Sequence, residues 1–364
     1  MVSLSAKALR YTRPKHVLAY GRERLSLATW RLTNLANSYT SRLLRIGGMS
    51  PVGSKPFYSR QQHVERVVRI SELIRSKFFS LLSAKKTKDL ASQHDFGRMP
   101  FVHYLEIFLK KKAAFQFSQQ PFQAQHMRAC GLDPELVSAA TLLHATAQLS
   151  ISKRSISDSA NLRMGLHSSA QIARLVYYAD KITGFIEDII LGFKLGYFEG
   201  GADVPIAESG LPQVFIEAFS LNVALIKRIK ICSRSEFNGV VVEIAENFLN
   251  TVSSAKTPYS TMQDFEHLIF DLNQKLRKGI MEPIIFVKQR EDLGFNHLCS
   301  QIFTPVINHL LQKHHDNKQA VIEALMGMDE ADLINLALSL GLNREVAIYN
   351  RRLSDIQSRW KTAN

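Results

Sequence analysis

Residues 172–189 read IARLVYYADKITGFIEDI, and this stretch decides the fold class. Its apolar side chains recur in steps of three and four residues, the spacing that brings side chains to one face of an α-helix. The face comprises Ile172, Leu175, Val176, Ala179, Ile182, Phe185, Ile186 and Ile189. A face of this length predicts a long buried helix, with Asp180 carried within it.

Further helices are predicted elsewhere in the chain. The apolar face that follows His63 consists of Val64, Val67, Val68, Leu73, Ile74, Phe78, Leu81 and Leu82. Another helix is expected to begin at Pro134, with Asp133 as its N-cap. Strand-like alternation is scarce, and 18 Gly and 11 Pro are few for 364 residues. We therefore predict an all-α protein.

Two polar stretches interrupt the helical pattern. Residues 199–212 contain glycines and prolines, and residues 251–262 are rich in Ser and Thr. Helical patterns resume on both sides of the second stretch, so we interpret it as a connection inside one helical body. We divide the chain into a basic N-terminal helical segment (1–48), a core (49–230) and a C-terminal helical region packed on the core (231–364).

The net charge of +14 is concentrated near the N-terminus. Residues 1–90 hold 18 Lys and Arg against 4 Asp and Glu, whereas the rest of the chain is balanced. Such a surplus predicts an anionic partner, either nucleotide phosphates, nucleic acid or an acidic surface. The alternative is a solvated or subunit-packing face. The first cations of the block are Lys7, Arg10, Arg13, Lys15, Arg22, Arg24 and Arg31.

Three cysteines, Cys130, Cys232 and Cys299, lie far apart and show no CxxC spacing. We expect buried thiols and no disulfide framework, and a cytoplasmic location is the simplest reading. The basic N-terminus matches an organelle transit peptide only weakly. No apolar run reaches about 18 residues, so no membrane span is expected.

Four residues form the strongest candidate for chemistry: His63, the adjacent pair His94 and Asp95, and Asp180. Two imidazoles and two carboxylates leave open positions on a six-coordinate ion, which suits Mn, Fe, Co, Ni or Mg better than a closed tetrahedral zinc site. A His-Asp pair alone carries little information, because such pairs arise by chance, and His315-Asp316 lies in a polar run. The alternative is a set of core histidines and capping aspartates.

The context of the first pair is more informative. The segment HDFGRMPFVH at 94–103 resembles the motif His-Asp-x-Gly-His-x-Pro-Phe-x-His of the deoxyguanosine triphosphate triphosphohydrolase-like HD family. Residues 58–67 (YSRQQHVERV) are similar to the family's Arg-x-x-His-Ser-x-x-Val segment, and 169–180 to the segment with its last Asp ligand. Together with a match at 42–52 and a looser one at 278–311, the resemblance spans about residues 40–311 in consistent order.

The resemblance implies an all-α HD-domain fold with additional C-terminal helices, in which 49–230 is the HD-domain core. It also implies that a divalent metal ion is held by the four residues named above, and that deoxynucleoside triphosphates are hydrolysed. Many family members are oligomers, so a homo-oligomer is expected. His103 and Glu106 match the family pattern near the metal, and Asp188 fits eight residues after Asp180.

The chain departs from the family at several positions. Arg98 stands where the family has a catalytic His, and Arg cannot exchange protons near neutral pH although it can hold a phosphate. Phe122 replaces a second His, and His126, one turn later, could supply an imidazole. Met49-Ser50-Pro51 replaces Lys-Thr-Gln, and Gly184 replaces a Tyr. These changes favour an altered substrate or lost turnover.

The sequence therefore gives one leading hypothesis, a metal-dependent phosphohydrolase acting on (deoxy)nucleotides. Its catalytic candidates are Arg98, His103 and His126, and its substrate-binding candidates are Arg60, Arg98 and Asp188. One alternative is a catalytically weak nucleotide sensor, motivated by Arg98 and Phe122. The other is a nucleic-acid-binding or nuclease HD protein, motivated by the basic first quarter of the chain.

Overall fold

The structure, a computed structural model of the chain, describes most residues from Arg60 to Trp360. The described ranges are 60–95, 101–111, 131–141, 168–199, 204–255, 259–326 and 330–360, together with residues 113, 115, 123, 124, 127, 128 and 328. These ranges contain helices and turns and no strand, so the all-α prediction is confirmed. None of the described helices combines the length and the apolar character needed to cross a membrane.

The chain divides into two compact units, neither of which is continuous in sequence. The first contains Met1–Gln61, Gly97–Ser118 and Lys288–Trp360, and the second contains Gln62–Phe96, Gln119–Val287 and Lys361–Asn364. All four predicted metal ligands belong to the second unit. The sequence-based boundary at 230/231 also falls inside the second unit, directly before the end of a helix.

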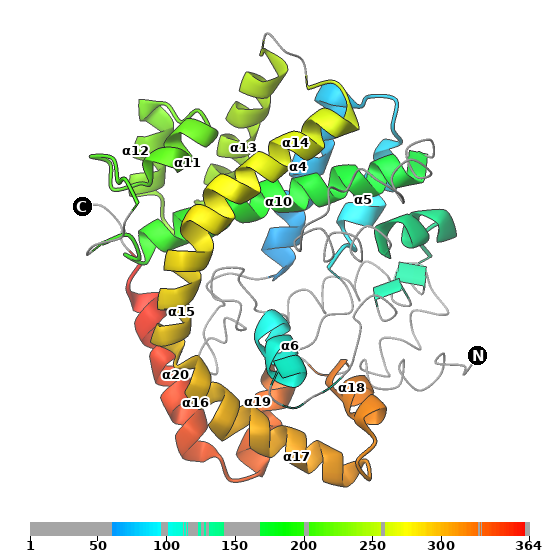
Figure 1. Cartoon of the computed structure of the whole chain (residues 1–364), viewed down its shortest axis with the longest axis vertical. Coiled ribbons are helices and arrows are strands. Elements are labelled where there is room, and N and C mark those ends of the chain that lie inside the picture. Colours follow the sequence, from blue (N-terminus) through cyan, green and yellow to red (C-terminus); the bar gives the residue numbers. More distant parts are fainter. Residues whose placement is uncertain are drawn as a thin grey trace. The chain divides into compact units, whose positions relative to one another are not determined.

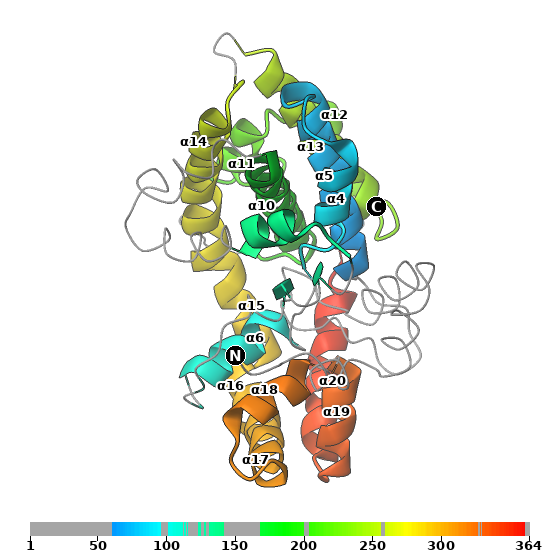
Figure 2. The ribbon, with the colours of Figure 1, turned by 90° about the vertical axis from the view of Figure 1, so that its right-hand side faces the viewer.

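Helix α10 is the central element of the second unit, and α5, α13 and α14 pack against it (Figure 1). The labelled helices of this unit are α4 (Arg60–Phe78), α5 (Ala84–Ala91), α10 (Ser168–Lys194), α11 (Gln213–Ala218), α12 (Val223–Ile231), α13 (Phe237–Ser253), α14 (Met262–Leu272) and the π-helical η1 (Asn273–Ile285). Figure 2 shows α14 on one side of α10 and α4 on the other. Residues on several faces of α10 are therefore shielded from water.

The predicted apolar face of α10 is confirmed, since all eight of its members are buried. Burial of α10 extends beyond that face and includes Asp180, Glu187 and Asp188. An ionised carboxylate is costly to remove from water unless a partner compensates it. The presence of three carboxylates on one buried helix therefore calls for specific partners on the neighbouring helices.

Helix α4 matches most of the face predicted after His63. Val64, Val67 and Ile74 are buried, but the prediction for Leu81 is wrong, because its side chain is fully exposed. The helix ends at Phe78, so Leu81 falls in the turn before the next helix and no longer follows the helical period. That next helix, α5, is capped by Ser83, whose side chain accepts a hydrogen bond from the Lys86 amide.

Other local predictions are also confirmed. The helix at residue 134 begins where expected, and the Asp133 carboxylate accepts a hydrogen bond from the Glu135 amide at 2.9 Å. The polar stretch 251–262 connects α13 to α14 within the second unit. A reciprocal capping box between Thr261 and Asp264 starts α14. Cys232 and Cys299 are buried, as predicted, whereas Cys130 lies outside the described residues.

The first unit is built from short helices around η2. They are α6 (Val102–Lys111), α15 (Phe286–Leu293), α16 (Phe295–His297), the π-helical η2 (Leu298–Phe303), α17 (Thr304–Lys313), α18 (Lys318–Met326), α19 (Glu330–Ser339) and α20 (Asn343–Ser358). Phe101 lies at its core, with its ring centroid 5.2 Å from that of Phe303 and 5.9 Å from that of Tyr349. Aromatic pairs at such distances add to the free energy of burial.

The buried face of α10 predicts a strong contrast between two truncations. Ile182→Ala removes a side chain with no exposed surface and should lower the free energy of unfolding by about 2–5 kcal/mol. Leu81→Ala removes a fully exposed side chain and should change it by less than about 0.5 kcal/mol. Urea denaturation of both variants measures the difference, and equal losses would contradict the assigned burial.

Candidate metal centre

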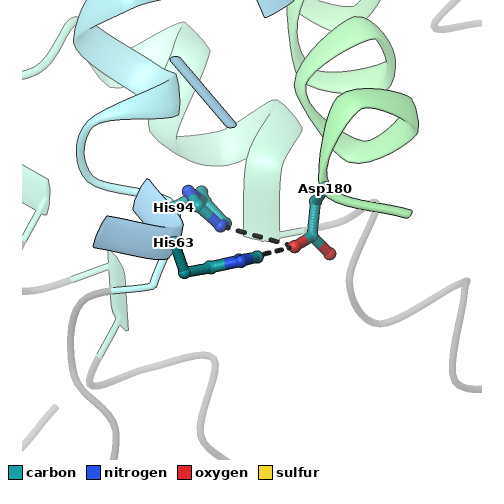
Figure 3. A group of neighbouring side chains, drawn as sticks. All are labelled: His63, His94 and Asp180. Carbon is teal, nitrogen blue, oxygen red and sulfur yellow. Dashed lines mark hydrogen bonds and ion pairs between the residues drawn. The ribbon is translucent and has the colours of Figure 1, made fainter. Parts of the chain in front are cut away.

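Three of the four predicted ligands converge on one buried point (Figure 3). His63 comes from the first turns of α4, His94 from the turn that follows α5, and Asp180 from the middle of α10. One ligand atom from each residue lies within 4.8 Å of the other two, and all three residues are buried. Residues that lie 31 to 117 positions apart in sequence thus supply ligand atoms to a single site.

The distances between these atoms would allow all of them to coordinate the same cation. Nε2 of His63 lies 3.2 Å from Oδ1 of Asp180, and Nε2 of His94 lies 3.6 Å from the same oxygen. Asp95, the fourth predicted ligand, joins the group, with its Oδ2 3.1 Å from His94 Nε2 and 3.5 Å from His63 Nε2. Neighbouring ligands at right angles around an ion at about 2.1 Å lie about 3 Å apart, close to these values.

Both imidazoles present the same nitrogen to the site. Nδ1 of His94 donates to the backbone carbonyl of Ala91 at 2.7 Å. The side-chain amide of Gln123 donates a hydrogen bond to the backbone carbonyl of His94. Nδ1 of His63 lies 3.0 and 3.1 Å from the two carboxylate oxygens of Glu187. Carbonyl and carboxylate oxygens accept hydrogen bonds, so each Nδ1 carries the hydrogen and each Nε2 faces the cluster.

Glu187 is a member of the site that the sequence-based reasoning missed. It has no exposed surface, and its Oε1 accepts a hydrogen bond from Nε of the buried Arg66 at 2.6 Å. Helical spacing could have indicated both residues. Glu187 follows Asp180 by seven residues, close to two turns of α10, and Arg66 follows His63 by about one turn of α4.

The donor set fits a divalent cation. Nε2 of His94 is buried and makes no hydrogen bond of acceptable geometry, although carboxylate oxygens surround it. Two imidazole nitrogens beside carboxylate oxygens are the ligands of transition-metal and magnesium-like ions. His63, His94 and Asp180 could therefore hold a metal ion, and Asp95 is placed to complete the set. The residues alone do not distinguish Mn, Mg, Fe, Co and Ni.

The carboxylates also change the protonation of His94. Burial alone would lower the pKa of this imidazole, but the charges of Asp95 and Asp180 outweigh it and raise the pKa to about 9. In the metal-free protein His94 is therefore protonated at neutral pH. A cation must displace that proton in order to bind Nε2.

The ammonium group of Lys181 and a small pocket lie beside the cluster. Nζ of Lys181 lies 3.8 Å from Oδ2 of Asp180 and 5.0 Å from the centre of the Tyr177 ring. His94 and Asp180 also face a pocket with space on the scale of a water molecule. The remaining lining is mostly apolar and consists of Leu90, Met127, Ala140, Ala173, Val176 and Tyr177.

Several other candidates from the sequence receive no structural test. Arg98, Phe122 and His126 lie outside the described residues, as does the basic segment 1–48. Arg60 and His103 lie in α4 and α6, but their side chains are outside the described set. Asp188 is buried in α10 directly after Glu187, and Gly184 is buried one turn after Asp180.

Comparison with known proteins adds no family to this geometry: no family model, curated protein or solved structure matches the chain.

Substitution of the central ligands should abolish metal binding. His94→Ala and Asp180→Ala each remove one ligand atom, so the affinity for Mn²⁺ or Co²⁺ should fall by more than about 100-fold. The control is His315→Ala, because His315 belongs to the other His-Asp pair and is exposed in the turn after α17. Titration calorimetry measures the affinities, and a metal site that survives both ligand variants would refute the assignment.

The protonation of His94 predicts how metal affinity depends on pH. Between about pH 7 and 9 the ion competes with a proton on this imidazole, so affinity should rise about tenfold per pH unit. The gain should level off above pH 9, where the metal-free imidazole is already neutral. Calorimetry in buffers of different ionisation enthalpy counts the released proton, and release of none at pH 7 would contradict the assignment.

Proposed function

We propose that the protein is a metal-dependent phosphohydrolase that acts on nucleotides. The observation that carries this proposal is the convergence of His63, His94 and Asp180, with Asp95 beside them, on one buried point. The same four residues are those that the resemblance to the HD family selects as ligands. The four residues come from three separate segments, so their proximity requires the fold as well as the motif.

The cluster explains how phosphate chemistry could proceed. When bound, a divalent cation supplies Lewis acidity towards a phosphoryl oxygen and a lowered pKa for a neighbouring water. The two imidazoles and the Asp180 carboxylate hold that cation in place. The small pocket beside His94 and Asp180 gives a water molecule a place next to the ligands. The apolar walls of this pocket limit the access of further solvent to the reacting atoms.

Lys181 is the residue that we assign to phosphate binding. It follows Asp180 directly, and its ammonium group lies at the edge of the carboxylate cluster, packed over the face of Tyr177. A phosphate that approaches the ion would meet this positive charge, which compensates part of the charge of the phosphate. In the absence of substrate, the contact with Asp180 keeps the ammonium group near the site.

Activity assays on the full-length protein test the proposal. The protein is incubated with Mn²⁺ and a panel of dNTPs, NTPs and nucleoside monophosphates, and free phosphate and triphosphate are measured. We expect a product that disappears when the metal is chelated. Nucleotide binding without turnover would instead support the sensor hypothesis, and salt-dependent binding of nucleic acid would support the nucleic-acid hypothesis. Either result without hydrolysis would overturn the proposed activity.

Lys181 provides a sharper test of substrate binding. Lys181→Gln should lower kcat/KM for the preferred nucleotide by about 10- to 100-fold, the effect of losing one charge-assisted hydrogen bond, while metal affinity is retained. The matched control is Lys227→Gln on α12, where the lysine is exposed and remote from the cluster in sequence. Equal kcat/KM values for the two variants would remove Lys181 from the substrate site.

A further inference from the structure

His63 is held from behind by a chain of buried polar side chains. Its Nδ1 meets both oxygens of Glu187, and Glu187 accepts a hydrogen bond from Nε of Arg66. Arg66 in turn donates to the side-chain oxygen of Asn238, and its guanidinium lies 5.3 Å from the centre of the Phe237 ring. The chain therefore runs from the start of α13, through α4 and α10, to the metal cluster.

Burying these charged side chains costs free energy of hydration. Glu187 has no exposed surface and Arg66 is only 2% exposed, so both charges have lost nearly all contact with water. A buried ion pair of this kind contributes little net stability compared with apolar side chains of similar volume. Net stability therefore does not explain why Glu187 and Arg66 are buried together, whereas a role for Glu187 in orienting His63 would.

We propose that Glu187 and Arg66 are positioning residues for the metal centre. Glu187 accepts the Nδ1 hydrogen of His63 and thereby directs the Nε2 lone pair towards Asp180 and the ion. Arg66 keeps Glu187 in place and compensates its charge. The inference rests on the metal-binding part of the proposed function and does not depend on which substrate is hydrolysed.

The two histidines are oriented by acceptors of different strength. His94 donates to a neutral backbone carbonyl, whereas His63 donates to a carboxylate. A carboxylate behind a metal-bound imidazole fixes the orientation of the ring and makes its other nitrogen a stronger ligand. His63 should therefore be the more tightly coordinated of the two imidazoles, and its contribution should depend on Glu187.

The main experiment measures metal affinity in a Glu187→Gln variant, with Co²⁺ alone as the probe. The amide preserves the size of the side chain and one acceptor but removes the negative charge behind His63. We expect Co²⁺ affinity to fall by about 10- to 100-fold and the visible spectrum of bound Co²⁺ to shift. The matched control is Glu72→Gln, the same change at another Arg–Glu pair, in which exposed Glu72 contacts Arg75 on α4 at 2.6 Å.

A double variant separates positioning from stability. Glu187→Gln leaves Arg66 as a buried charge without its carboxylate, which can destabilise the fold by itself. Replacing both residues, as Arg66→Met with Glu187→Gln, removes that charge, so the melting temperature should recover at least in part. Co²⁺ affinity should nevertheless stay about 10- to 100-fold below that of the wild type, because the carboxylate behind His63 is still missing.

The outcomes separate this inference from the proposed activity. Affinity that recovers together with the melting temperature in the double variant, or a Glu187→Gln variant with wild-type affinity and spectrum, would overturn the positioning role. A wild-type protein that binds Co²⁺ without hydrolysing any nucleotide would refute the activity and leave the positioning role intact. A wild-type protein without Co²⁺ affinity would refute both.

Discussion

The constraint on which the structure depends is the burial of carboxylates along α10. Removing an ionised carboxylate from water costs several kcal/mol unless charges and hydrogen bonds replace the lost hydration. Asp180 and Glu187 lie two turns apart on this helix, and both meet the imidazole of His63. Helix α4 therefore has to place His63 beside Asp180 and Glu187, and Arg66 beside Glu187. This requirement restricts how α4 can be shifted along α10.

The same requirement organises the residues around the cluster. Asp95 and Asp180 place two carboxylates beside two imidazoles, and in the metal-free protein they raise the pKa of His94 to about 9, against the opposing effect of burial. A divalent cation bound there would carry a larger positive charge than that proton and would contact several carboxylate oxygens at once. The donor set is thus better matched to a metal ion than to a proton. Glu187 contacts the opposite nitrogen of His63, Nδ1, and its own charge is compensated by Arg66.

Helices with a regular repeat of apolar residues can be predicted from the sequence. The apolar steps around Asp180 predicted α10, because a buried helix face repeats every three to four residues. The period does not locate the end of a helix, and Leu81 was misassigned for this reason. The candidate ligands stand out only through the family-like motif, since a His-Asp pair alone also occurs in the exposed turn at His315. Helical spacing places Glu187 near the side of α10 that carries Asp180, but its contact with His63 joins two helices, and no local motif indicates that contact.

The proposed metal site requires that His63 and His94 coordinate one ion through their Nε2 atoms. Pulsed electron paramagnetic resonance of the protein loaded with one equivalent of Mn²⁺ tests this most directly, because nitrogen ligands modulate the electron spin echo. We expect one tightly bound ion per chain with two imidazole nitrogens, one of which disappears in His63→Ala and the other in His94→Ala. An ion coordinated only by oxygen and water, or the absence of a tight site, would contradict it.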